Sequence, residues 1–191
     1  MTVAPRHIFS LLFLASFVAA CENSQKDIDT WTKDKLLREE ATGVESYMSQ
    51  EGKMKARLIA PLMYRMVDSR LPNDSQYVEF PDSLHVDFYN DSLQIETWLD
   101  CLYAKYYERE ERVYLRDSVV VITVKGDTLK SPDLWWDQRK GIFYTDKYAQ
   151  YITKDNNIQG NKGLVATQDL KKVSFEMPTG IFDMKETGPE P

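Results

Sequence analysis

The sequence has few of the cysteines and histidines on which disulfide-bonded domains and many enzymes depend. It holds two cysteines, Cys21 and Cys101, and two histidines, His7 and His85. A Ser-His-Asp triad would have His85 as its only base outside the apolar N-terminal segment, and no nucleophile-elbow sequence lies near it. The turn at residues 154–157 lacks the spaced ligands of a calcium loop. We therefore expect no catalytic residue, no cofactor and no metal site.

Basic residues are also in the minority, with 24 Lys and Arg against 30 Asp and Glu and a net charge of −6. This acidic balance, together with the absence of any nucleic-acid motif, excludes DNA and RNA as expected partners. The same balance provides no long-range attraction for an anionic ligand. Such a ligand would have to be held by burial of its apolar groups or handed over by a partner.

Long apolar runs are missing, except for thirteen uncharged residues from Ile8 to Ala20. A helix of that length rises about 20 Å, short of the roughly 30 Å hydrocarbon core, so a permanent membrane span is not expected. Arg6 before this run and small residues after it are typical of a secretory signal peptide. The sequence from Val18 to Cys21 is also similar to a bacterial lipobox, which predicts acylation at Cys21. An ordinary cleaved signal is the alternative.

With Cys21 acylated, Cys101 has no disulfide partner, and its neighbours Leu99 and Leu102 predict a small buried hydrophobic side chain. The polar residues 21–43 predict a tether, and the prolines and glycines of 178–191 predict a loose tail. The expected organisation is a signal peptide at 1–20, a lipidated tether at 21–43, a folded body at 44–177 and a flexible tail at 178–191.

The sequence does contain the alternation of apolar and polar residues that is typical of β-strands. From Met54 to Met66 every second residue is apolar, so a strand here has one apolar side and one partly cationic side. Shorter runs rich in β-branched and aromatic residues follow, separated by turn formers such as Asn90-Asp91 and Gly126-Asp127. These runs are 77–80, 85–89, 93–99, 113–124, 141–145 and 173–177. We expect an all-β, antiparallel body with an apolar interior.

The alternation also predicts which side chains share the inner face. An apolar groove open to water is a large exposed patch, and such patches usually mark binding sites. Acyl chains suit it, because each buried methylene contributes about 0.8 kcal/mol. A closed sandwich, whose apolar faces only pack on each other, is the alternative. The side chains expected to line a lipid-binding groove are Leu58, Leu62, Tyr64, Ile95, Leu99, Val119, Val121, Val173 and Phe175.

Three segments carry a family resemblance, in the order in which the family has them. They are Glu51-Gly52 followed by 57–60 (RLIA), Leu99-Asp100 with Ala104 and Tyr106-Tyr107, and Gly163-Leu164 after Gly160. They resemble the LptC family, the periplasmic bridge component of the lipopolysaccharide-export machinery, over about residues 44–177. These are strand and turn patterns rather than catalytic signatures, and Leu99 stands where the family has alanine.

The resemblance implies a twisted, open antiparallel β-jellyroll in the periplasm that binds the lipid A acyl chains of lipopolysaccharide. It implies that the protein receives lipopolysaccharide from an inner-membrane ABC transporter and passes it to a related periplasmic jellyroll. Sheet edges near Gly52 would face the transporter, and edges near Gly160, Gly163 and Leu164 would face the downstream jellyroll. Many members have a transmembrane helix where this chain has a lipobox cysteine, so we expect a lipid anchor in the inner membrane.

The residues alone are also compatible with two other functions. Adjacent Trp135 and Trp136 suit sugar stacking, and Asp133 and Asp137 are carboxylates of the kind used in acid–base chemistry. Together they describe a carbohydrate-binding lipoprotein. The other function is that of a structural envelope lipoprotein without a ligand.

Overall fold

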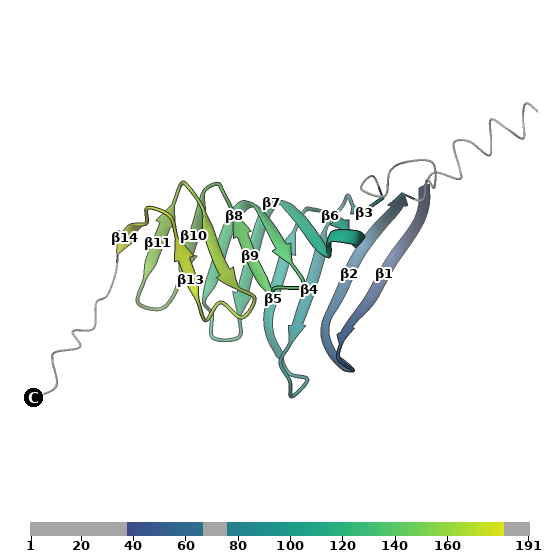
Figure 1. The fold of residues 1–191 in the computed structure, drawn as a ribbon, viewed down its shortest axis with the longest axis horizontal. Coiled ribbons are helices and arrows are strands. Elements are labelled where there is room, and N and C mark those ends of the chain that lie inside the picture. The colour runs from purple at the N-terminus through teal and green to yellow at the C-terminus, as the bar shows by residue number, and fades with distance from the viewer. Residues whose placement is uncertain (1–37, 67–75, 182–191) are drawn as a thin grey trace, which may run out of the picture. The chain divides into compact units, whose positions relative to one another are not determined.

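The computed structural model describes residues 38–66 and 76–181, which belong to one compact unit (Figure 1). This part of the chain forms one sheet of fourteen strands with antiparallel pairing, and its only helical element is the 3₁₀ turn η2 (Glu108–Glu110). The prediction of an all-β, antiparallel, jellyroll-like body is confirmed. The signal peptide, Cys21 and most of the expected tether lie outside the described residues.

The strands are β1 (Arg38–Gln50), β2 (Lys53–Met66), β3 (Val78–Phe80), β4 (Leu84–Tyr89), β5 (Ile95–Cys101), β6 (Tyr103–Tyr107), β7 (Arg112–Thr123), β8 (Thr128–Asp137), β9 (Ile142–Thr145), β10 (Ala149–Ile152), β11 (Asn157–Gly160), β12 (Leu164–Thr167), β13 (Val173–Phe175) and β14 (Thr179–Ile181).

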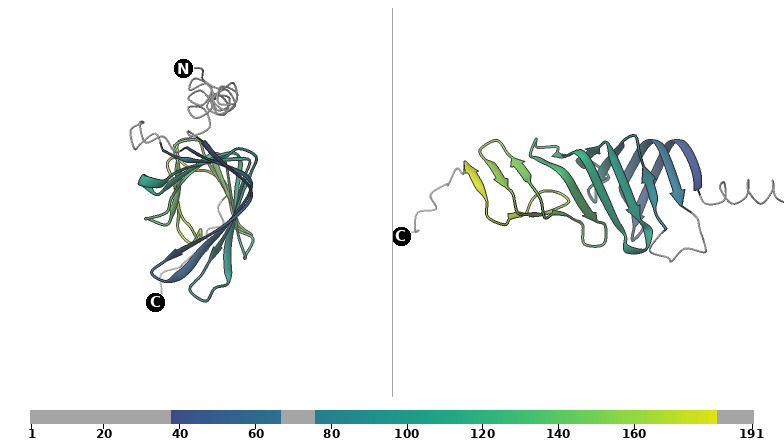
Figure 2. Two further views of the ribbon diagram at one scale, coloured as in Figure 1. Left: turned by 90° about the vertical axis from the view of Figure 1, so that its right-hand side faces the viewer. Right: turned by 90° about the horizontal axis from the view of Figure 1, so that it is seen from above.

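Three long strands, β2, β7 and β8, change neighbours part-way along their length and so belong to two layers. The first layer runs β1-β2-β4-β5-β7-β8-β10-β11-β14, and the second runs β2-β3-β6-β7-β8-β9-β12-β13. In β7 the change falls at Asp117 and Ser118, which have φ of 64° and 57° where the register with β8 shifts. Such a bulge bends a strand and lets it continue in another direction. The end-on view in Figure 2 shows the strands curving around a common interior.

The core lies between the inner faces of the two layers. Phe88 of β4 packs from the first layer against Trp136 and Phe143 of the second, with ring centroids 4.9 Å and 5.9 Å apart. Both contacts are edge-to-face, the arrangement that aromatic rings prefer. The layers are therefore held together by apolar contacts from strands far apart in the sequence.

The β1–β2 hairpin begins the body and corrects the predicted N-terminal boundary. β1 starts at Arg38, inside the segment expected to be a tether. Only Ala41, Val44 and Met48 of β1 are half-buried, so its sequence shows too little alternation to predict a strand.

At the other end of the body, β14 lies inside the segment expected to be a tail. Glu51 and Gly52 connect β1 to β2 with φ of 53° and 76°, the positive values that a two-residue type I′ hairpin turn requires.

We expect Phe88→Ala to destabilise the body by about 3–5 kcal/mol, because it removes a ring that touches both layers. Leu102, which is 55% exposed, provides the matched control, and Leu102→Ala should change the free energy of unfolding by less than about 0.5 kcal/mol. Denaturant unfolding of the two variants measures both values. Equal and small effects would show that the layers do not depend on this contact.

Candidate functional site

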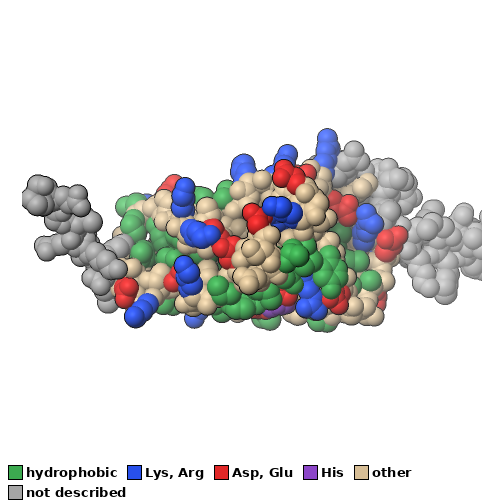
Figure 3. Space-filling view, turned by 90° about the horizontal axis from the view of Figure 1, so that it is seen from below, with side chains coloured by type: hydrophobic (Ala, Val, Ile, Leu, Met, Phe, Trp, Pro, Cys, Tyr) green, Lys and Arg blue, Asp and Glu red, His purple; other side chains and the backbone are tan. Residues whose placement is uncertain are grey.

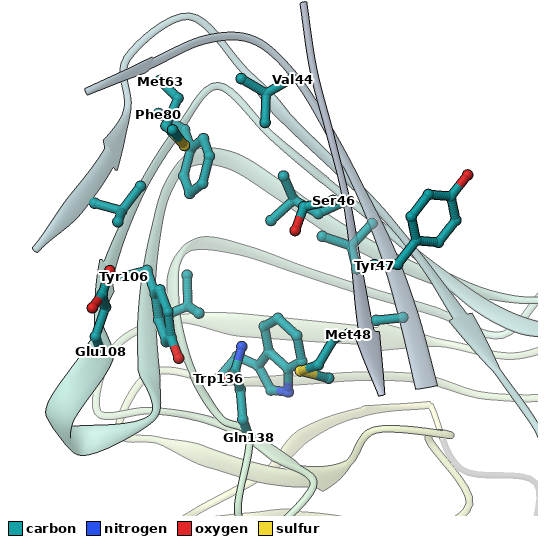
Figure 4. Close-up of a pocket in the computed structure, with 15 residues that line it drawn as sticks. Val44, Ser46, Tyr47, Met48, Met63, Phe80, Tyr106, Glu108, Trp136 and Gln138 are labelled. Carbon is teal, nitrogen blue, oxygen red and sulfur yellow. The ribbon is translucent and has the colours of Figure 1, made fainter. Parts of the chain in front are cut away.

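An apolar cavity of about 310 Å³ lies between the two layers at the β1 end of the body. Its volume falls at the lower end of the roughly 300–1,000 Å³ typical of ligand pockets. Figure 4 shows Val44, Ser46 and Met48 directed from β1 toward the cavity, whereas Tyr47 points away. The lining side chains come from β1 to β8 and are Val44, Ser46, Tyr47, Met48, Ala56, Leu58, Met63, Val78, Phe80, Val86, Tyr106, Glu108, Val113, Trp136 and Gln138.

Small residues on the β2 side of the hairpin leave this space unfilled. Met48 pairs with Ala56, and Val44 pairs with Ala60, so two alanines face the interior where larger side chains would fill it. Trp136 is 2% exposed and donates its indole N–H to the Gln168 side chain at 3.2 Å. Its ring is therefore fixed where it contributes to the cavity wall.

Polar groups lie only at the margin of the cavity. Glu108 of η2 and Gln138 after β8 belong to its lining, and Arg65 pairs with Glu108 at 3.3 Å. Ser46 is exposed although it lines the cavity, so the cavity opens to solvent beside β1. An apolar interior with a few polar groups at the mouth is typical of a binding site for an apolar ligand group.

Of the residues predicted on the first long strand, Leu58 lines the cavity, but Leu62 and Tyr64 do not. Met63 takes their place, because the inward face changes after Pro61. Tyr64 pairs with Glu79, whose neighbours Val78 and Phe80 are buried and line the cavity, so Glu79 and Tyr64 point to the outer face. Simple alternation was wrong for this half of β2.

The middle of the predicted groove is closed. Leu99, Val119 and Val121 are at most 1% exposed and belong to the packed core. Ile95, at the start of β5, is half-buried. Val173 and Phe175 are partly buried at the other end of the body, where Phe175 lines a separate cavity of about 350 Å³. The structure therefore has an open cavity at one end and a filled interior behind it.

The residues predicted at partner interfaces occupy different settings. Gly52 lies in the exposed β1–β2 turn. Gly160 is buried, and a Cβ there would approach the Phe175 ring to 2.6 Å, so this glycine allows close packing. Gly163 has φ of 131°, and Leu164 is buried in β12, which pairs with both β9 and β13. The backbone of β12 is thus not free to pair with a partner, and the outermost strands of the described sheet at this end are β13 and β14.

The residues considered for other chemistry are mostly engaged in the fold. Asp133 is 6% exposed and accepts hydrogen bonds from Thr145 and Lys147, and Asp137 pairs with Lys140 at 3.5 Å. Cys101 is a free, buried cysteine, and burial raises the pKa of its thiol to about 12. The prediction of a small buried hydrophobe at Cys101 is confirmed.

Sequence reasoning missed a charged network on the outer face of the first layer. His85 lies between two carboxylates, with Nδ1 2.7 Å from Asp100 and Nε2 3.1 Å from Asp87. Asp87 continues the network to Arg57, which donates a 2.7 Å hydrogen bond to Glu45 of β1. Burial lowers the pKa of His85, but its hydrogen bonds to Asp100 and Asp87 outweigh this, and the net pKa is raised above its ordinary value. The signal was the His85-x-Asp87 spacing, which places both side chains on one strand face.

No protein-family model matches the chain, and no curated protein does. Within residues 38–66 and 76–181, no helix is long and apolar enough to span a membrane. The same residues contain no cluster of His, Cys, Asp and Glu suited to a metal ion.

The His85 network predicts a pH-dependent stability. Because the folded-state pKa of His85 is raised above its unfolded value near 6.5, its contribution is fully present below that pH and is lost as pH rises through the folded-state pKa. Melting temperatures measured from pH 5.5 to 8.5 should fall over this window in the wild type. The fall should be weaker in His85→Gln, which removes the titrating group. The same decline in both proteins would show that His85 is not its source.

Proposed function

We propose that this protein binds lipopolysaccharide in the periplasm, receives it from an inner-membrane ABC transporter and passes it to a periplasmic jellyroll partner. The observation that carries the proposal is the apolar cavity between the layers. Its lining consists mainly of apolar side chains from both layers, so a ligand is held there by burial of apolar groups. Each methylene buried there contributes about 0.8 kcal/mol. The cavity therefore suits part of an acyl chain rather than a whole lipid A.

A polar cleft beside the cavity supports an amphiphilic ligand over a purely apolar one. This cleft of about 690 Å³ shares Met48 and Gln138 with the cavity lining. Its walls carry Lys55, Arg139 and Lys140 from both layers, together with the carboxylates Asp91, Glu96 and Asp169. On the face seen in Figure 3, hydrophobic side chains reach the surface between charged ones. An acyl chain in the cavity would leave its charged headgroup at this cleft, where ammonium and guanidinium groups bind phosphate.

The unpaired edge of β1, which adjoins the Gly52 turn, supports assembly with the upstream transporter. Within the described sheet, β1 pairs with β2 alone along its thirteen residues. An exposed edge presents unpaired N–H and C=O groups and is a template for strand addition. The β1 edge adjoins the mouth of the cavity, since Val44 and Met48 line it. A partner strand added to β1 would therefore extend the apolar interior along the direction of transfer.

The carbohydrate-binding alternative is weakened by the positions of its residues. Trp136 is buried in the core, so the two adjacent tryptophans do not form one stacking surface. Asp133 and Asp137 are buried and paired with lysines, an arrangement typical of structural carboxylates.

We expect Ser46→Trp to block the cavity and to weaken lipopolysaccharide binding at least tenfold. Ser46 is exposed at the cavity mouth, so the fold should tolerate an indole that occupies the space of the ligand. Displacing two buried methylenes costs about 1.6 kcal/mol, which corresponds to more than a tenfold loss of affinity. Val124→Trp, at a side chain that is 55% exposed and not in the lining, is the control and should bind as the wild type does. Binding is measured with purified protein and fluorescent lipopolysaccharide.

Charge provides a second variant for the same cavity. Leu58→Asp places a carboxylate where acyl chains must lie, so binding should fail while circular dichroism still shows the β-sheet. Leu62→Asp and Val121→Asp, at two other residues of the expected groove, do not test the cavity, because Leu62 does not line it and Val121 is fully buried. Unchanged binding in both Ser46→Trp and Leu58→Asp would exclude the cavity as the lipid site.

A further inference from the structure

The outer face of the second layer is covered with aromatic side chains. On β3, β6, β7 and β8 the buried residues Phe80, Ala104, Leu115 and Trp136 point inward, so the residues that alternate with them point outward. These outward residues and their cross-strand partners form what we call the aromatic face. Its aromatic members, all half-buried, are Tyr64, Tyr77, Tyr103, Tyr107, Tyr114, Trp135 and Tyr144.

The rings of the aromatic face form a continuous series centred on Trp135. The Trp135 ring lies 5.0 Å from Tyr114, 5.9 Å from Tyr107 and 6.4 Å from Tyr144, and Tyr107 lies 6.5 Å from Tyr77. They come from β6, β7, β8, β9 and the residue before β3. Cross-strand aromatic pairs stabilise a sheet. A sheet needs few such pairs, however, and this series spreads over most of the width of one exposed face.

Cations are stacked on these rings and reach the solvent. Lys105 lies 3.4 Å over the Tyr77 ring, Arg116 lies 4.1 Å over Tyr103 and Arg112 lies 5.4 Å over Trp135. The side chains of Arg112 and Arg116 are 38% and 48% exposed. No ion pair joins Lys105 to a carboxylate among the described residues, although Glu79 is its cross-strand neighbour, and its ammonium group lies over the rings of Tyr77 and Tyr107.

The carboxylates of this face are hydrogen-bonded or ion-paired. Asp133 is 6% exposed and is covered by Lys147, and Glu79 accepts a 2.7 Å hydrogen bond from the Tyr103 hydroxyl. Glu110 and Asp117 at the margin pair with the two arginines. The outer face of the first layer instead carries charged residues joined in ion pairs. There the side chains of Glu45 and Asp100 are 44% and 57% exposed, and the ion pairs of that face involve Arg57 and His85. Among the described residues, the cation–ring contacts all lie on the aromatic face.

We propose that the aromatic face lies on the surface of a phospholipid bilayer. Tyrosine and tryptophan combine an apolar ring with a polar tip and are enriched at the headgroup level of membranes. Lysine and arginine cover apolar surface with their stems and direct their charge to the phosphates. Cationic groups near an anionic bilayer each contribute about 1 kcal/mol to attraction. Sugars or a protein surface also use aromatic rings, but cations already lie over the rings of Tyr77, Tyr103 and Trp135.

The point where the chain joins the body supports this orientation. Arg38, the first described residue, lies 3.9 Å over the ring of Tyr64, a member of the aromatic face. The sixteen residues 22–37 before it span at most about 55 Å. A lipid anchor at Cys21, expected from the sequence, would thus hold the body within reach of the bilayer. The proposal does not depend on lipopolysaccharide binding or on the anchor itself.

The test uses the mature chain with Cys21→Ser, which carries no acyl group. It is sedimented with vesicles of phosphatidylethanolamine and phosphatidylglycerol, and with vesicles of phosphatidylcholine alone. We expect binding to the anionic vesicles that weakens at least threefold between 50 and 300 mM salt. Lys105→Glu, an outward change that leaves the core intact, should reduce binding at least fivefold. The matched control is Lys130→Glu, at an exposed position on the first layer, and it should bind as the parent does.

Trp135 provides an independent readout. Its fluorescence should be quenched by brominated lipid in the parent, and Trp135→Phe should lose most of the quenching, whereas Trp98→Phe on the outer face of the first layer should retain it. Ser46→Trp and Leu58→Asp, which act on the cavity, should still bind vesicles. Absence of vesicle binding, or equal losses in Lys105→Glu and Lys130→Glu, would overturn the proposal. Binding of soluble oligosaccharide without vesicle binding would assign the aromatic face to sugars instead.

Discussion

The whole body depends on long strands that keep one apolar side inward while they pass from one layer to the other. β2, β7 and β8 each pair with strands of both layers, so neither layer can form without the other. The contact of Phe88 with Trp136 and Phe143 closes the interior between them. Because the same strands form both walls, the width of the interior is set by which side chains face inward at each point along the body.

That constraint explains why a cavity exists at one end and a filled core behind it. In the middle, Leu99 and Val121 face each other across paired strands and leave no space. At the β1 end, Ala56 and Ala60 face inward from β2, and β1 is the last strand of the first layer. Apolar walls without a large side chain between them leave a solvent-connected space, in which burial of apolar ligand groups is favourable. The outer faces are set by the same alternation, which places stacked rings with cations over them on one layer and the ion-pair network of His85 and Arg57 on the other.

The sequence predicted the strand class because alternation is strong where a strand is buried on one side, as from Lys53 to Ala60. It did not predict β1, since an edge strand with one exposed face and an unpaired margin needs few apolar residues. It misplaced Leu62 and Tyr64, because the change of face after Pro61 depends on pairing with β3, which is a tertiary contact. The burial of Val119 and the exposure of Ser46 likewise depend on where the opposite layer ends. No local pattern contains that information.

The central claim is that acyl chains occupy the cavity between the layers, and site-specific photo-crosslinking in cells tests it most directly. A photoreactive amino acid at position 48, where Met48 lines the cavity, should form adducts that contain lipopolysaccharide. The same amino acid at position 102, where Leu102 is 55% exposed on the outer surface, should form none. Adducts at both positions, or at neither while the protein remains folded and expressed, would contradict the claim.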